Sequence, residues 1–281
     1  MLWPTAPHAI TIDQMIRKDA GASMAAGATL GYKNFTVDLW WTDLNTTEVG
    51  IFQRARHRAK SRQFTKDSDI IGAVNINGER TGLLTHREGI WKEADGMKRR
   101  LVVKLFTQDM NWRGTLDMLM GRSLQLTLGA HGFPVMAYSV NISGHDQIVN
   151  VERSARKWPL IPEDYSFFIL EDKRPRFYRL RRDWISIGTD YTLYDETDTK
   201  IGHLNGRVID LGGRWDVTIR EDHNNPRVNG TLQLFCGMLR FRKRVERHLR
   251  SLARDVKRGR LEPQMEAHEA DLYLNPRRRN Y

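Results

Sequence analysis

Short runs in which apolar and polar residues alternate occupy most of the chain. Runs such as RLVVKLF (100–106), SFFILED (166–172) and RWDVTI (214–219) have the two-residue period that is typical of β-strands. Turn residues separate the runs every five to ten positions, and about twelve runs precede residue 229. This spacing favours a closed or sandwiched antiparallel sheet, so we predict a mainly β protein.

Local signals predict how some of these runs connect. Asn77-Gly78 between two apolar runs is typical of a tight β-hairpin, and the polar stretch 194–199 (YDETDT) predicts a hairpin turn. The pattern of 112–121 (WRGTLDMLMG) favours a short helix that Gly121 ends, followed by a strand over 123–129 (SLQLTLG). Residues 21–31, rich in small side chains without a period, predict a connector.

One long helix is predicted over 229–259, with Asn229 as its cap and Gly259 as its end. In its first half, apolar residues cover nearly every face, so protein must surround it. In its second half, Val245, Leu249, Leu252 and Val256 form a single stripe opposite a face of arginines. We therefore expect a sheet to wrap the first half and the second half to lie on the surface.

A family resemblance supports this arrangement. The stretches FYRLRRDWISIGTDYTLYDE and KIGHLNGRVIDLGGRW, followed by the apolar helix, resemble the LURP-one-related family. That family belongs to the tubby C-terminal-like superfamily, which also includes phospholipid scramblases. The resemblance covers about residues 176–256. It implies a tubby-like antiparallel β-barrel around a hydrophobic C-terminal helix.

The same resemblance suggests how the chain is divided. We expect an N-terminal extension over 1–30, a tubby-like C-terminal domain over 165–260 and a tail over 261–281, whose last residues, 269–281, are either frayed, which we favour, or a docking peptide. Residues 31–155 form either a separate β-rich N-terminal domain, which we favour, or the first half of one barrel.

Charge is concentrated near the end of the chain. The chain of 281 residues holds 45 Lys and Arg against 34 Asp and Glu, a formal net charge of +11. Residues 240–260 alone contain ten basic and two acidic residues, a net charge of +8. A smaller basic patch spans 56–62, and the tail adds the arginines of 277–279. Such an excess favours an anionic partner, although a basic protein without one has the same composition.

Motifs for catalysis, cofactors or metals are missing from the sequence. No phosphate-binding loop, nucleophile elbow or dinucleotide fingerprint occurs, and the histidines form no metal-binding frame. His86 with Glu88, His203 and His223 are therefore interpreted as structural residues. The single cysteine, Cys236, lies in the apolar part of the helix, where burial raises the pKa of a thiol and makes it inert. We predict a non-enzymatic protein with no catalytic residue, cofactor or metal.

Two further features point to location. No run reaches 18 to 20 apolar residues, and the first residues lack the pattern of a secretory signal. We therefore expect a cytoplasmic protein, which a basic surface could hold at the periphery of a membrane.

The basic part of the helix supplies the candidate anion-binding residues: Arg240, Arg242, Lys243, Arg244, Arg247, Arg250 and Arg254. An anionic phospholipid surface is the leading partner; Trp184 and Phe241 could add interfacial anchoring, but we expect both to be core residues. Two alternatives stay open: a nucleic-acid backbone, or a scaffold role in which the helix docks on an acidic protein.

Overall fold

The computed structural model describes residues 31–40, 61–155, 163–171, 174–184, 189–207 and 213–274. Four sequence predictions lie wholly or mostly outside these ranges: the extension over 1–30, the connector over 21–31, the basic patch over 56–62, and the arginines of 277–279. The chain divides into residues 1–31 and 32–281, and all that follows concerns the second unit.

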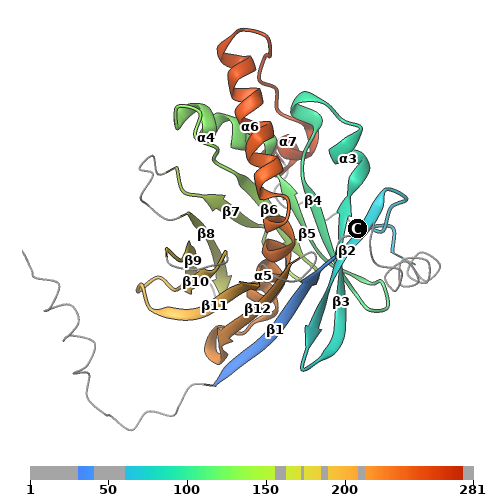
Figure 1. The fold of residues 1–281 in the computed structure, drawn as a ribbon, viewed down its shortest axis with the longest axis vertical. Coiled ribbons are helices and arrows are strands. Elements are labelled where there is room, and N and C mark those ends of the chain that lie inside the picture. Colours follow the sequence, from blue (N-terminus) through green and yellow to red (C-terminus); the bar gives the residue numbers. More distant parts are fainter. Residues whose placement is uncertain are drawn as a thin grey trace, which may run out of the picture. The chain divides into compact units, whose positions relative to one another are not determined.

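Twelve antiparallel strands form a closed barrel in which each strand pairs with the next and the last pairs with the first (Figure 1). The strands are β1 (Tyr32–Leu39), β2 (Ser68–Ile76), β3 (Glu79–Arg87), β4 (Val102–Thr107), β5 (Trp112–Met118), β6 (Ala137–Ile142), β7 (Val149–Arg153), β8 (Asp164–Glu171), β9 (Arg174–Arg182), β10 (Tyr191–Tyr194), β11 (Lys200–Arg207) and β12 (Arg214–Arg220).

Helices fill the barrel and cover one of its ends (Figure 1). They are α3 (Glu88–Lys92), α4 (Met120–Gly129), α5 (Pro226–Leu239), α6 (Arg242–Lys257) and α7 (Ala267–Leu274), with 3₁₀ turns at Gly96–Lys98 and Glu221–His223. The expected mainly β fold, an antiparallel barrel around a hydrophobic C-terminal helix, is confirmed. None of the helices in the described ranges is long and apolar enough to cross a bilayer.

Both halves of the chain build the same barrel. Strands β1 to β7 come from residues 32–153 and β8 to β12 from residues 164–220, and β7 pairs with β8 through Glu152 opposite Ser166. Our preference for a separate N-terminal domain is therefore wrong, and the first half of one barrel is the arrangement found. The reason is that β1 pairs with β12 over seven residues, so neither half closes without the other.

Helix α5 lies in the centre because apolar side chains cover nearly all of its faces. Phe235, fully buried, meets the rings of Tyr165 and Tyr191 edge-on, at 5.0 and 5.5 Å between centroids. Gly230 sets how closely the helix approaches the wall, because a Cβ there would lie 2.8 Å from Cδ1 of Ile142. The helix and the inward faces of the strands thus form one continuous core.

The predicted long helix is two helices. Helix α5 is capped by Asn225, four residues before the predicted cap: the Asn225 side chain accepts a hydrogen bond from the Val228 N–H, and Pro226 occupies the first turn. It ends at Leu239, and α6 begins at Arg242. The predicted end at Gly259 is confirmed: this glycine, at φ +68°, follows the last turn of α6 and donates to the Val256 carbonyl.

The structure reverses the helix and the strand that the sequence predicts over 112–129. Residues 112–118 form strand β5 rather than a helix, and residues 123–129 belong to helix α4 rather than to a strand. In α4 the buried side chains follow helical spacing, and two of them bind the passing chain: Ser123 accepts from the Ala137 N–H and Thr127 from the Val135 N–H. These bonds favour the helix over the alternation of leucines.

Both predicted turns are confirmed. Asn77 and Gly78, with φ of 53° and 80°, join β2 to β3. Asp195 accepts hydrogen bonds from the backbone of Thr197 and Thr199 and so closes the turn between β10 and β11.

Candidate anion-binding surface on helix α6

Helix α6 leaves the barrel with one apolar face and one basic face. Val245, Leu249 and Leu252 are buried against the rest of the protein. An exposed basic stripe lies on the opposite side of the helix. Its residues are spaced alternately four and three positions apart, so they share one face. The stripe consists of Lys243, Arg247, Arg250, Arg254 and Lys257.

Most cations of α6 lack an acidic partner. Arg250 lies 3.5 Å from Glu246, one turn earlier. Elsewhere on the exposed faces of α6, no described carboxylate lies within ion-pair distance of Lys243, Arg244, Arg247, Arg254, Lys257 or Arg258. The positive charge is therefore available to an external anion.

Part of the stripe lines a groove of about 530 Å³ between α6 and the turn after α4. The turn contributes His131 and Gly132, whose φ values of 56° and 92° reverse the chain at the end of α4. The helix contributes Ala253 and the basic side chains Arg247, Arg250, Arg254 and Lys257. Four cations thus converge on one open hollow.

Arg240 and Arg242, the first two predicted anion-binding residues, have other partners. Arg240 donates to the backbone carbonyls of Trp40 and Ile71. Arg242 pairs with Glu163, and the side chains of both are almost completely buried. The remaining five predicted residues, Lys243, Arg244, Arg247, Arg250 and Arg254, are exposed on α6.

The pair of Arg242 and Glu163 belongs to a buried ionic network at the end of the barrel from which α6 emerges. Glu163 also accepts a hydrogen bond from the Tyr165 hydroxyl at 2.8 Å and lies 3.3 Å from Arg153. Arg153 reaches onward to Glu246 on α6 at 2.9 Å. Burial is the largest influence on Arg242 and disfavours its charge, but Glu163, with smaller contributions from Tyr191, Tyr165 and Glu246, outweighs it and raises the pKa of the guanidinium. The network fixes the start of α6, and no local sequence pattern could reveal it.

The two proposed aromatic anchors lie in different environments. Phe241 is 4% exposed and stacks on His86, with 4.3 Å between ring centroids, so it is a core residue. Trp184 is 63% exposed, so the expectation that it is a core residue is wrong. It follows β9, whose last residues pair with the first residues of β8 and β10. Arg242, at the start of α6, contacts Glu163 and Tyr191, which lie at the beginning of β8 and β10. Trp184 therefore lies at the end of the barrel from which α6 leaves.

His86 is buried at the junction of α5 and α6. Among the described residues its Nε2 has no hydrogen-bond partner, and only 4% of the residue is exposed. Burial lowers the pKa of the imidazole to about 4; Glu88 opposes the shift, whereas the cations Arg240, Arg244 and Lys92 add to it. His86 is therefore neutral in the folded protein near pH 7.

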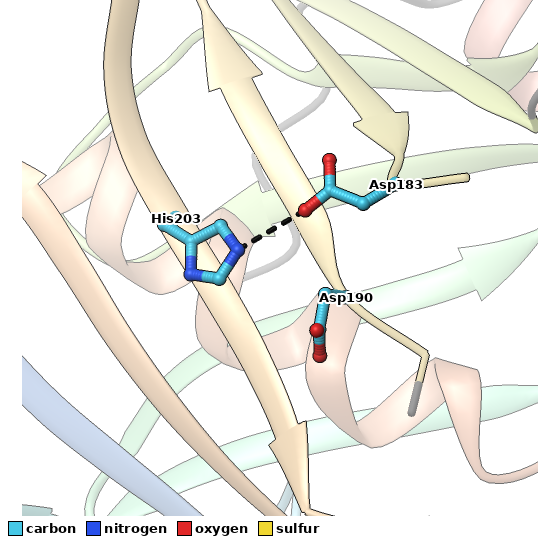
Figure 2. A group of neighbouring side chains, drawn as sticks. All are labelled: Asp183, Asp190 and His203. Carbon is cyan, nitrogen blue, oxygen red and sulfur yellow. Dashed lines mark hydrogen bonds and ion pairs between the residues drawn. The ribbon is translucent and has the colours of Figure 1, made fainter. Parts of the chain in front are cut away.

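Asp183, Asp190 and His203 approach one another on the outer wall, and Figure 2 shows His203 turned toward Asp183. Their potential ligand atoms lie within 4.8 Å of one another. Protein groups already bind them: His203 Nε2 is 3.1 Å from Asp183, the Thr192 hydroxyl donates to Asp183 at 2.8 Å, and the Gly206 N–H donates to Asp190 at 2.9 Å. These bonds join β9, β10 and β11, so we interpret the cluster as structural.

Two other predicted structural residues are in the described ranges. His223 is buried in a 3₁₀ turn, where its Nδ1 lies 3.3 Å from the Tyr178 hydroxyl. Cys236 is fully buried in α5, and burial raises the pKa of its thiol, as predicted.

No family model, curated protein or solved structure matches the chain. The barrel and its central helix are therefore established from the structure, whereas membership of the LURP-one-related family stays a prediction from residues 176–256.

Proposed function

We propose that this protein is a non-enzymatic, tubby-like module that binds anionic membrane lipid at its periphery through the basic face of α6. The observation that carries the proposal is the stripe of exposed cations on α6, most of which no described carboxylate neutralises. An anionic bilayer presents a continuous negative surface, which suits a straight row of cations better than a single ionic partner does.

The expected strength is moderate. Each Lys or Arg close to an anionic surface contributes about 1 kcal/mol, so the five residues of the stripe supply about 5 kcal/mol. An attraction of that size corresponds to a submillimolar dissociation constant, weak enough for reversible attachment. Trp184, exposed at the same end of the barrel, would add an aromatic ring at the headgroup level.

Co-sedimentation with vesicles tests the proposal. Vesicles of phosphatidylserine and phosphatidylcholine should bind the protein at low salt and release it at high salt, whereas pure phosphatidylcholine should not bind it. The variant K243E/R247E/R254E should lower the affinity by at least about 100-fold, because it removes three attractive charges and adds three repulsive ones.

A matched control changes the net charge equally but elsewhere. Lys98, Arg113 and Lys200 are exposed, and the variant K98E/R113E/K200E should keep most of the vesicle binding. Equal losses in both variants would mean that net charge alone acts, and would contradict a site on α6. If the protein binds no vesicles but binds duplex DNA or an acidic protein, that result would favour the corresponding alternative partner.

A further inference from the structure

A second recess lies on the outer wall of the barrel and shares no residue with the groove on α6. It has a volume of about 280 Å³. Strands β4, β5 and β6 form its floor, the segment around Gln63 covers one side, and α7 covers another. Its polar residues include Lys104, Arg100, Asp117 and His268, and Trp112 and Leu272 give it apolar walls.

Helix α7 is held firmly over this recess. The carboxylate of Glu269, which is fully buried, accepts hydrogen bonds from the N–H groups of Gly121 and Arg122 at 2.8 and 2.7 Å. A carboxylate suits this position because the first turn of α4 has unpaired N–H groups and a partial positive charge. The fraying predicted for 269–281 is therefore wrong for 269–274, and the anchored helix makes the recess a defined cavity.

Lys104 carries a buried charge without an ionic partner. Only 5% of the residue is exposed, and its Nζ donates to the backbone carbonyl and the side-chain Oε1 of Gln63, at 2.7 and 3.0 Å. Among the described residues no carboxylate lies within ion-pair distance of this nitrogen. The two acidic groups that influence its charge are already paired, Asp67 with Arg87 at 2.7 Å and Asp117 with Arg100 at 2.9 Å.

A lysine in this state is costly to the folded protein. A buried ammonium group loses its hydration, and neutral oxygens replace only part of it. Burial, with a smaller contribution from Arg87, lowers the pKa of Lys104 to about 8. An apolar side chain at this position would avoid the cost, and a ligand that supplies the missing negative charge would compensate for it.

A second buried polar atom of the recess has no hydrogen bond to any described residue. His268 Nε2, on α7, is buried without a hydrogen bond and lies 3.9 Å from Asp117. With Lys104 it offers two places where a ligand oxygen would be bound. The indole of Trp112, fixed by its hydrogen bond to Thr115 at 2.9 Å, supplies a flat apolar surface beside them.

We propose that this recess binds a small aromatic or otherwise flat monocarboxylate, whose carboxylate pairs with Lys104 while its body packs between Trp112 and Leu272. One negative charge is favoured because Lys104 is the only cation of the recess without an acidic partner among the described residues. The volume of about 280 Å³ favours a small ligand.

Benzoate is the probe, and NMR of the lysine side chains is the readout. Benzoate should shift the Lys104 signal and raise its pKa by about one unit or more, as an opposite charge at close range does. Benzamide, which has the same shape without the charge, should bind at least about tenfold more weakly. The variant K104M should fold, because no unpaired charge is left behind, and should lose benzoate binding; the exposed-site control K98M should keep it.

Three results would overturn the proposal: an unchanged Lys104 pKa at saturating millimolar benzoate, equal binding of benzamide, or wild-type binding by K104M. The first is measured on the unmodified protein and does not depend on the folding of a variant. Vesicle binding through α6 and benzoate binding here use different residues, so the failure of one leaves the other unaffected.

Discussion

His86 gives the folded protein a pH dependence that can be calculated and tested. The imidazole is neutral and buried in the native state, with a pKa of about 4, whereas its value in the unfolded chain is 6.5. Below pH 6.5 the unfolded state therefore binds the proton and the folded state does not. The contribution of His86 to the free energy of unfolding is therefore fully present above pH 6.5 and is lost as the pH falls toward 4.

The difference between the two pKa values sets how much stability His86 contributes. Proton linkage predicts a loss of about 2 kcal/mol between pH 7.5 and pH 5, rising to about 3 kcal/mol at lower pH. His145, His223 and His248 have pKa values that are also lowered, first of all by burial, so they act in the same direction. The contribution of His86 must therefore be measured as a difference between proteins.

Denaturant unfolding at pH 7.5 and pH 5 provides that difference. His86→Phe keeps a ring against Phe241, and His86→Gln removes the ring; neither side chain titrates in this range. Between pH 7.5 and pH 5, the free energy of unfolding should fall by about 2 kcal/mol less in both variants than in the wild type, whatever their stability at pH 7.5. The expectation rests on the buried Nε2, which has no hydrogen-bond partner among the described residues.

Two results would refute this reasoning. One is a wild-type pH dependence in both variants, within about 0.5 kcal/mol, which is the usual additivity error. The other is an NMR titration that places the pKa of His86 in the folded protein near 6.5.

Three further predictions concern stability and can be measured by denaturant unfolding or hydrogen exchange. Glu163→Gln should cost about 3–5 kcal/mol, because it leaves Arg153 and Arg242 buried without their shared carboxylate; E163M/R242M should cost less. Gly202→Ala should destabilise by about 1–3 kcal/mol, because its Cβ would lie 2.6 Å from the Thr218 carbonyl oxygen, whereas Gly129→Ala, with open space around it, should not destabilise; equal effects would contradict the steric account. Glu269→Gln should cost about 1 kcal/mol and speed amide exchange at Gly121 and Arg122, and unchanged exchange there would show that the carboxylate does not cap α4.

The fold was predictable where one local pattern had one structural meaning. Asn77-Gly78 permits positive φ at two successive positions, and the apolar residues of α5 cover nearly all its faces, so each signal allowed a single interpretation. The residues of α4 were ambiguous, because alternating leucines suit a strand and only the bonds of Ser123 and Thr127 to the chain at 135–137 favour a helix.

The candidate sites were predictable only in part, for a similar reason. The basic stripe of α6 is local, and its spacing is visible in the sequence. The burial of Lys104 depends on Gln63, which is 41 residues away in the chain, and the partner of Arg242 lies 79 residues away. Contacts between such distant residues leave no local pattern.

Closure of the barrel has a consequence for the order in which this protein can fold. Strand β1 must wait for β12, from Arg214–Arg220, before its outer edge is paired, and the interior stays empty until α5 has been synthesised. Pairings between such distant segments slow folding, and partly made sheets expose apolar surface in the meantime. During synthesis on the ribosome, a sheet of the first eleven strands would therefore have two unpaired edges, on β1 and β11, and no central helix until β12 and α5 follow.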